Sequence, residues 1–193
     1  MSEVDKSKSI TDKDKELLDS LVQEKKSIDA FRKINAAPIP VSIYRHSSLV
    51  EALEIELGEL DSALKDAPSE DRKKAIEERQ VELTKRLDEQ EKDKIEGILT
   101  PLTYRDINDI KAAITEAIIH FNDYNFDPEV KMARVLMEER YMTVFCSLKK
   151  KNSPKVRYFR TLDEIALVDE DTINLLHKLW ENQFVLTEDE LKN

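Results

Sequence analysis

Four glutamates in one short stretch have the spacing that metal chemistry requires. Glu51, Glu54, Glu56 and Glu59 lie where the leucine spacing predicts a helix. In a helix, Glu56 and Glu59 would project from the same face, one turn apart. Mg²⁺ prefers carboxylate oxygens of this kind, held at near-octahedral geometry. The stretch can therefore supply half of a magnesium site, which a second carboxylate pair would have to complete.

The run Glu56-Leu57-Gly58-Glu59-Leu60 resembles the first acidic motif of the all-α nucleotide pyrophosphohydrolases of the MazG kind. The resemblance implies a second pair, Glu-x-x-Asp, on a later helix. No such pair occurs between Glu70 and Glu96. Because charged runs usually form solvated helix faces, we keep the hydrolase only as an alternative and expect a protein that is not an enzyme.

The other chemistry-bearing residues do not form a recognisable site. His46, His120 and His177 are far apart, and none begins a metal-ligand spacing. Cys146 is the only cysteine and lies within an apolar stripe, which predicts a small buried residue. The acidic run at 169–171 lacks the glycine and the final glutamate of a calcium loop, and it suits the first turn of a helix. We therefore predict no catalytic, cofactor-binding or metal-binding residues.

Charge is distributed unevenly along the chain. Residues 51–97 carry 16 acidic and 9 basic residues, residues 131–160 carry 2 acidic and 9 basic residues, and residues 161–193 carry 9 acidic and 2 basic residues. The basic band includes Tyr158 and Phe159, and such cation and aromatic pairs can bind single-stranded nucleic acid. The net charge of −10 disfavours binding to nucleic acid, because the phosphate backbone would be repelled. We expect no nucleic acid, and instead an acidic partner or the acidic C-terminal segment of the chain itself.

The composition favours helices. The 193 residues include 37% charged residues but only 2 Gly and 6 Pro. Rossmann folds, phosphate-binding loops and β-rich folds need glycine at tight turns. We predict an all-α fold with a charged helical hairpin extension and a compact C-terminal helical domain. The expected units are an N-terminal helix and proline-containing linker at 1–45, a charged αα-hairpin at 46–98, and the compact helical domain at 99–193.

Start signals and apolar spacing place the individual helices. Asp127 is expected to cap a central helix at 128–151, and Thr103 with Asp106 to open its neighbour at 104–124. Ser47 or Ser48 is expected to cap the first hairpin helix. Ser69 follows the break at Ala67-Pro68 and should cap the second hairpin helix, over residues 70–96. Further predictions are a helix at 11–34, a linker or apolar strap at 36–44, a basic loop at 149–155, an extended segment at 156–160, a capping box at 161–164, a helix at 169–184 and a last turn from residue 187.

The sequence gives no indication of a membrane protein. Residues 1–9 contain no apolar signal region, and no stretch reaches the 18 or so apolar residues that a membrane-spanning helix needs. A single cysteine also fits a reducing compartment. We expect a soluble intracellular protein without membrane contact.

The C-terminal half resembles a known family. The segments TYRDINDIKAAITEA, ARVLMEERYMTVFCSLKK and RYFRTLDEIALVDEDTINLLHKLWENQF are similar in order and texture to the tail assembly chaperones of long-tailed bacteriophages. The resemblance covers residues 100–190. It implies a non-enzymatic helical protein of the host cytoplasm that coats the helical tape measure protein and helps tail tube subunits to polymerise. Many copies along one partner would also imply self-association.

Apolar residues that remain exposed on charged helices would hold a partner helix in a groove. The candidate partner-binding residues are Leu49, Leu53, Leu57, Leu60 and Leu64 of the hairpin seam, Ile39 and Ile43 of the strap, and Tyr158, Phe159, Trp180 and Phe184. The seam repeats at coiled-coil spacing. A structural coiled-coil subunit of a phage or other large assembly is therefore the main alternative, ahead of the MazG-like hydrolase.

Overall fold

The computed structural model describes residues 36–122 and 127–185. Within these ranges 69% of the residues are helical. The helix predicted at 11–34 and the last turn predicted from Thr187 lie outside the described residues. None of the described helices is both long enough and apolar enough to cross a bilayer.

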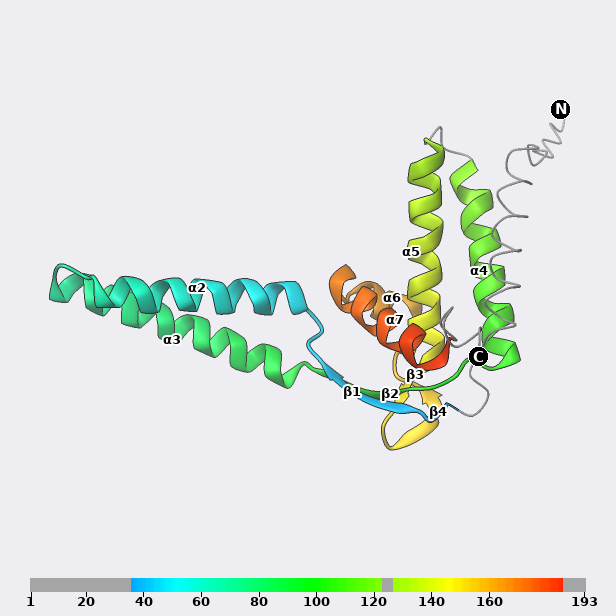
Figure 1. The fold of residues 1–193 in the computed structure, drawn as a ribbon, viewed down its shortest axis with the longest axis horizontal. Coiled ribbons are helices and arrows are strands. Elements are labelled where there is room, and N and C mark those ends of the chain that lie inside the picture. Colours follow the sequence, from blue (N-terminus) through cyan, green and yellow to red (C-terminus); the bar gives the residue numbers. More distant parts are fainter. Residues whose placement is uncertain (1–35, 123–126, 186–193) are drawn as a thin grey trace, which may run out of the picture.

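The elements follow one another as strand, two helices, strand, two helices, two strands and two helices. In chain order they are β1 (Ile39–Ile43), α2 (Ser47–Lys65), α3 (Glu70–Lys92), β2 (Ile95–Leu99), α4 (Tyr104–Asn122), α5 (Pro128–Ser147), β3 (Leu148–Lys150), β4 (Ser153–Arg157), α6 (Leu162–Ala166) and α7 (Glu170–Phe184). Figure 1 shows α2 and α3 as a long arm, which we call the arm, and the other elements gathered into a body.

The four strands correct the all-α prediction. They form one antiparallel sheet in the order β1-β2-β3-β4, so the fold is mainly helical with a small sheet. Ile39 pairs with Leu99 and Ile43 with Ile95, while Leu148 pairs with Leu99 from the other side. β1 is an edge strand. Pro40 is tolerated there because it has no N–H to donate, and an N–H on the open side of an edge strand has no neighbouring strand to bond. The strap predicted at 36–44 is therefore a paired strand.

Two predicted helices end earlier than expected because the sheet takes their last residues. α3 stops at Lys92, and Ile95–Leu99 becomes β2. α5 stops at Ser147, where Leu148 adopts extended backbone angles and begins β3. The predicted basic loop at 149–155 instead belongs largely to β3 and β4. The extended segment predicted at 156–160 begins earlier, because β4 spans 153–157.

Gly97 is required by the close approach of β2 to β3. A Cβ atom at this position would lie 2.8 Å from the backbone oxygen of Lys149 and 2.9 Å from Cδ1 of Leu148. We expect Gly97→Ala to lower the free energy of unfolding by about 1–3 kcal/mol, because the strands would have to separate. Chemical denaturation followed by circular dichroism measures this.

The matched control is Gly58→Ala in α2, where nothing lies within 4 Å of an added Cβ. There the change should raise stability by about 0.5–1 kcal/mol, since alanine is the better helix former. Equal effects at the two glycines would contradict the strand packing described here.

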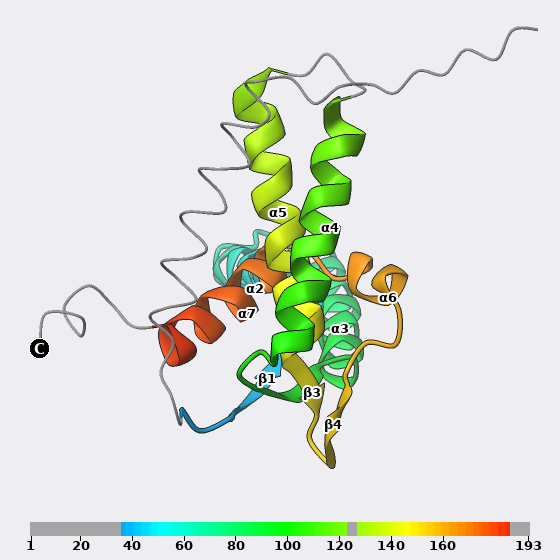
Figure 2. The ribbon, with the colours of Figure 1, turned by 90° about the vertical axis from the view of Figure 1, so that its right-hand side faces the viewer.

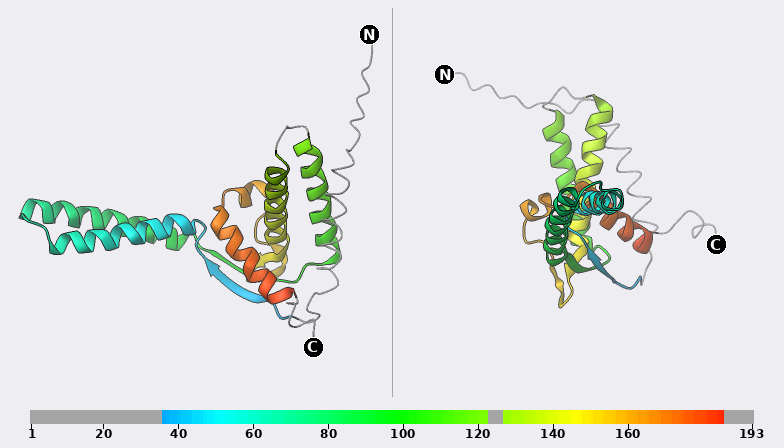
Figure 3. Two further views of the ribbon diagram at one scale, coloured as in Figure 1. Left: turned by 45° about the horizontal axis from the view of Figure 1, so that its top comes forward. Right: turned by 90° about the vertical axis from the view of Figure 1, so that its left-hand side faces the viewer.

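The arm is an antiparallel helical hairpin with its own small core. β1 leads into α2 and the chain passes from α3 into β2, and the two helices extend away from the body (Figure 1 and the left view of Figure 3). Val50, Leu53, Ile76 and Leu83 are buried but do not belong to the core of the body. The predicted cap at Ser69 is confirmed, because its hydroxyl accepts a hydrogen bond from Arg72 N at 3.3 Å.

Asp169 fixes the base of the arm to the body. One of its carboxylate oxygens accepts from Thr172 N at 2.8 Å and so caps α7, while the other accepts from Ser48 N at 3.1 Å and Ser48 Oγ at 2.7 Å. The prediction that Ser47 or Ser48 caps α2 is wrong, since both lie inside the helix and the N-cap His46 makes no side-chain cap. Asp169, the N-cap of α7, instead accepts from the backbone N–H of Ser48 at the start of α2.

The body is built around α5. α4 and α5 run side by side, and α6 and α7 pack against α5 (Figure 2). Residues 142–147 at the end of α5 are all buried, as is Leu148, which begins β3. The predicted caps of the body are confirmed: Asp127 accepts from Glu129 N at 2.9 Å, Thr103 and Asp106 bond reciprocally, and Thr161 accepts from Glu164 N. The apolar face of β1 and β2 completes the core.

Candidate partner-binding site

The leucine seam of the arm faces its own hairpin partner. Leu53 is buried and Leu49, Leu57, Leu60 and Leu64 are half-buried, with Ile76 and Leu83 of α3 buried in the same hairpin. Ion pairs and hydrogen bonds between the helices hold this packing, including Arg79 to Glu56 at 2.8 Å and Gln80 to Asp61. The seam therefore holds the arm together and leaves no open leucine groove.

The carboxylates that could have held Mg²⁺ are not assembled into a site. Glu56 is paired with Arg79, which also contacts Glu82 at 2.8 Å. Glu59 is exposed, as are Glu51 and Glu54. In the described part of the chain, no further His, Cys, Asp or Glu joins Glu56 and Glu59 in a group of possible metal ligands. The positive charge that pairs with Glu56 is thus the guanidinium of Arg79 on α3.

Most of the other candidate partner residues contact the core. Ile39 and Ile43 on β1 and Tyr158 are half-buried and pack against the core cluster, and Phe159 and Phe184 belong to it. Trp180 is 4% exposed, and its indole Nε1 donates to the backbone oxygen of Thr100 at 3.1 Å. In the described conformation Trp180 and Phe184 fill space between the body's own elements and line neither of the two cavities described below, whereas Phe159 is 2% exposed and lines one of them.

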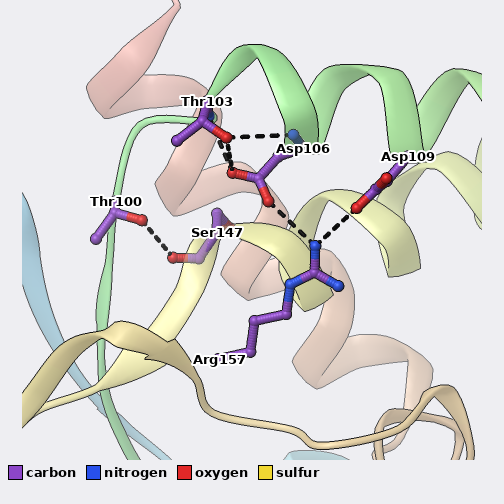
Figure 4. Close-up of polar contacts among 6 residues, drawn as sticks. All are labelled: Thr100, Thr103, Asp106, Asp109, Ser147 and Arg157. Carbon is purple, nitrogen blue, oxygen red and sulfur yellow. Dashed lines mark hydrogen bonds and ion pairs between the residues drawn. The ribbon is translucent and has the colours of Figure 1, made fainter.

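A partly buried ion pair fixes the basic strand β4 to α4. Figure 4 shows Arg157 Nη2 between two carboxylates, 3.2 Å from Asp106 and 2.9 Å from Asp109. Asp106 also accepts from Thr103 N and Thr103 Oγ1. Burial would raise the pKa of Asp106, but the Thr103 hydrogen bonds, the nearby Lys149 charge and Arg157 together lower it. Asp106 is therefore ionised and structural.

The same place contains a group that resembles a metal site. Ligand atoms of Asp106, Asp109 and Cys146 lie within 4.8 Å of one another. Arg157 already bridges the two carboxylates, and burial raises the pKa of the Cys146 thiol to about 11. A neutral thiol is a poor metal ligand. Asp106 and Asp109 therefore form an ion pair with Arg157, and Cys146 is a buried neighbour of that pair. The prediction that Cys146 is buried is confirmed.

Two open cavities on the body remain as candidate sites. The first, which we call the apolar groove, has a volume of about 510 Å³. It lies between α4, α5 and α6 and is lined mainly by apolar side chains, namely Phe121, Met137, Tyr141, Leu162, Ile165 and Ala166. Arg134, Glu138 and Asp163 supply its charged groups, and burial raises the pKa of Glu138. The groove therefore offers a mainly apolar surface to a partner.

The second cavity, which we call the basic cavity, has a volume of about 570 Å³. It lies beside the turn between β3 and β4 and is lined by Arg45, Lys150 and Lys151, with Tyr158, Phe159 and Leu167 as its apolar wall. Glu96 and Glu164 also line it, and Glu164 accepts a hydrogen bond from Arg160 N. Of the predicted basic band at 131–160, Arg134, Lys151, Lys155 and Arg160 are exposed.

Periodicity alone did not reveal either cavity. The groove combines residues from α4, α5 and α6 that lie in three separate stretches, and the basic cavity combines Arg45 with residues more than a hundred positions later. The sequence carries no local signal for the groove, because the exposure of Leu162, at 46%, depends on how α6 packs against the body.

Comparison with known proteins gave no relative. The chain matches no protein-family model, no curated protein and no solved structure.

Proposed function

We propose that the chain is a non-enzymatic tail assembly chaperone that holds helical segments of phage structural proteins, the tape measure protein or tail tube subunits, during assembly. The observation that carries this proposal is the apolar groove. It opens next to the α4–α5 helix pair on a molecule whose net charge is −10. An amphipathic helix that places its apolar face in such a groove is a common mode of reversible recognition.

The arm supports the same proposal. It is a charged helical hairpin that contacts the body at its base, so most of its length is free to lie along an extended partner (Figure 1). Exposed apolar residues occur singly on it, with Ile55 57% exposed and Val81 71% exposed. A mainly charged surface keeps a chaperone and its apolar client in solution. The pairing of Glu56 with Arg79 disfavours the hydrolase alternative, because Glu56 would be one of the Mg²⁺ ligands.

A binding measurement with purified proteins tests the proposal. The full-length chain is titrated with helical fragments of a phage tape measure protein, and affinity is followed by calorimetry. We expect Leu162→Glu, at the rim of the groove, to weaken binding at least about tenfold, because a charge would enter the apolar interface. Leu175→Glu is the matched control, because Leu175 is similarly exposed at 42% but lies on α7, outside the groove.

Three outcomes distinguish the readings. Reversible binding that is sensitive only to Leu162→Glu supports the chaperone. Permanent retention of the chain in purified particles favours the structural subunit. Nucleoside triphosphate cleavage that requires Mg²⁺ and is lost in Glu56→Gln favours the hydrolase, and it would overturn the proposal.

A further inference from the structure

α2 carries an acidic face with no compensating charge of its own. Between residues 47 and 64 there are five acidic residues and no basic one. Glu51, Glu54 and Glu59 are exposed, and within the described residues none of the three has an ion-pair partner. Ile55 is exposed between them, and the neighbouring Gly58 has open space around its backbone. We call this set the acidic face.

The turn between β3 and β4 carries the opposite charge. From Lys149 to Arg160 there are six basic residues and no acidic one. Arg157 is occupied by Asp106 and Asp109. Lys150, Lys151 and Lys155 have no ion-pair partner among the described residues. Lys150 and Lys151 line the basic cavity together with Glu96, Glu164 and Arg45, and Arg45 is paired with Asp93 at 3.2 Å. The wall of that cavity includes Leu167, which is 69% exposed and could receive an apolar side chain.

The two surfaces of one molecule do not meet. The arm runs away from the body, whereas the β3–β4 turn lies on the body beyond the base of the arm (Figures 1 and 3). These two surfaces can therefore pair with each other only between copies. Because the two surfaces differ and every copy has both, their contact would be heterologous, which produces a ring or an open chain of subunits.

We infer that the acidic face of one copy docks on the basic cavity of a second copy and that the protein forms head-to-tail oligomers. Ile55 enters the cavity against Leu167 while Glu54 and Glu59 contact Lys150, Lys151 and Lys155. Gly58 removes the side chain that would hold the two backbones apart. The contact depends on charge, so salt weakens it. The inference does not depend on the proposed client, because it needs only this chain.

Charge exchange on the full-length protein tests the inference. One variant carries Glu51→Lys, Glu54→Lys and Glu59→Lys, and the other carries Lys150→Glu, Lys151→Glu and Lys155→Glu. We expect each variant alone to associate at least about tenfold more weakly than the parent chain in sedimentation velocity, because like charges then face each other. An equimolar mixture of the two should associate again, since each variant supplies the complement of the other. Circular dichroism verifies that both remain folded.

The control is Glu77→Lys, Glu78→Lys and Glu89→Lys on α3, which makes the same change in net charge at exposed positions outside the acidic face. It should leave association within about twofold of the parent chain. A parent chain that is monomeric at all concentrations, or a mixture that does not associate, would overturn the inference.

Carbodiimide cross-linking of mixed heavy-isotope and ordinary copies locates the contact. Cross-links between Lys150 or Lys151 of one copy and Glu54 or Glu59 of another are expected. Cross-links of these lysines only within a single copy would contradict head-to-tail docking.

Discussion

Trp180→Ala is expected to lower the free energy of unfolding by about 3–5 kcal/mol, one of the largest effects of any single substitution in this chain. The side chain is 4% exposed and its ring lies 6.1 Å from that of Phe184. Its indole N–H also satisfies the backbone oxygen of Thr100, between β2 and α4. Truncation would leave a large cavity and an acceptor without its partner.

Urea denaturation at neutral pH measures this effect. The control on the same helix is Leu175→Ala, which removes a side chain that is 42% exposed and should cost less than about 1 kcal/mol. If Trp180→Ala were as mild as Leu175→Ala, the indole would not be a core residue, and a role in partner binding would return as the better explanation.

Arg157→Met is expected to destabilise the protein by about 2–3 kcal/mol at neutral pH. Methionine keeps the aliphatic packing against Phe145, over whose ring the guanidinium lies at 4.8 Å. It removes the cation that bridges Asp106 and Asp109, and Asp106 is only 5% exposed. The buried carboxylate of Asp106 would then keep only the Thr103 hydrogen bonds and the nearby Lys149 charge. Asp109→Asn is the control, because Asp109 is far more exposed and its loss leaves Asp106 paired.

The same pair predicts how stability depends on pH. The pKa of Asp106 in the folded protein is below its ordinary value of 3.8. The unfolded chain therefore binds the proton more readily, and the stabilisation by ionised Asp106 is fully present above pH 3.8 and lost as the pH falls below it. The difference between the parent chain and Arg157→Met should consequently shrink in acid. A difference that is equal at pH 7 and pH 3 would contradict the assignment.

Local signals in the sequence were sufficient for the helices. Ser69, Asp127 and Thr161 each cap the helix that follows, as their neighbours along the chain predicted. Such caps involve residues two or three positions apart, so a short window contains both donor and acceptor. Ser47 and Ser48 show the limit, because the acceptor at the start of α2 is Asp169, more than a hundred residues away.

The sheet could not be predicted by the same means. β2 has five residues and β3 has three, and both directly follow helices with apolar stripes. Their pairing partners lie far away in sequence, as in Ile39 with Leu99 and Leu99 with Leu148. A short apolar run gives no indication of whether it continues a helix or begins a strand. The low glycine content was a weak guide, because the sheet needs a glycine only at position 97.

The candidate site shows a similar limit. The spacing of Leu49, Leu57 and Leu64 correctly indicates an apolar helix face, but it does not say whether that face contacts α3 or another protein. In the structure it contacts α3. The exposed groove depends on how α6 lies against α5, which is a property of the tertiary structure. Only the uneven distribution of charge could be obtained from the sequence alone.

Co-purification of the tagged full-length chain from the cells that naturally produce it, read by mass spectrometry, is the measurement that decides between the proposed chaperone and its alternatives. The expected result is recovery of a long, helical tape measure protein or a tail tube subunit, with recovery reduced by Leu162→Glu and unchanged by Leu175→Glu. Recovery of the chain without any tail protein, together with Mg²⁺-dependent cleavage of nucleoside triphosphates, would contradict it.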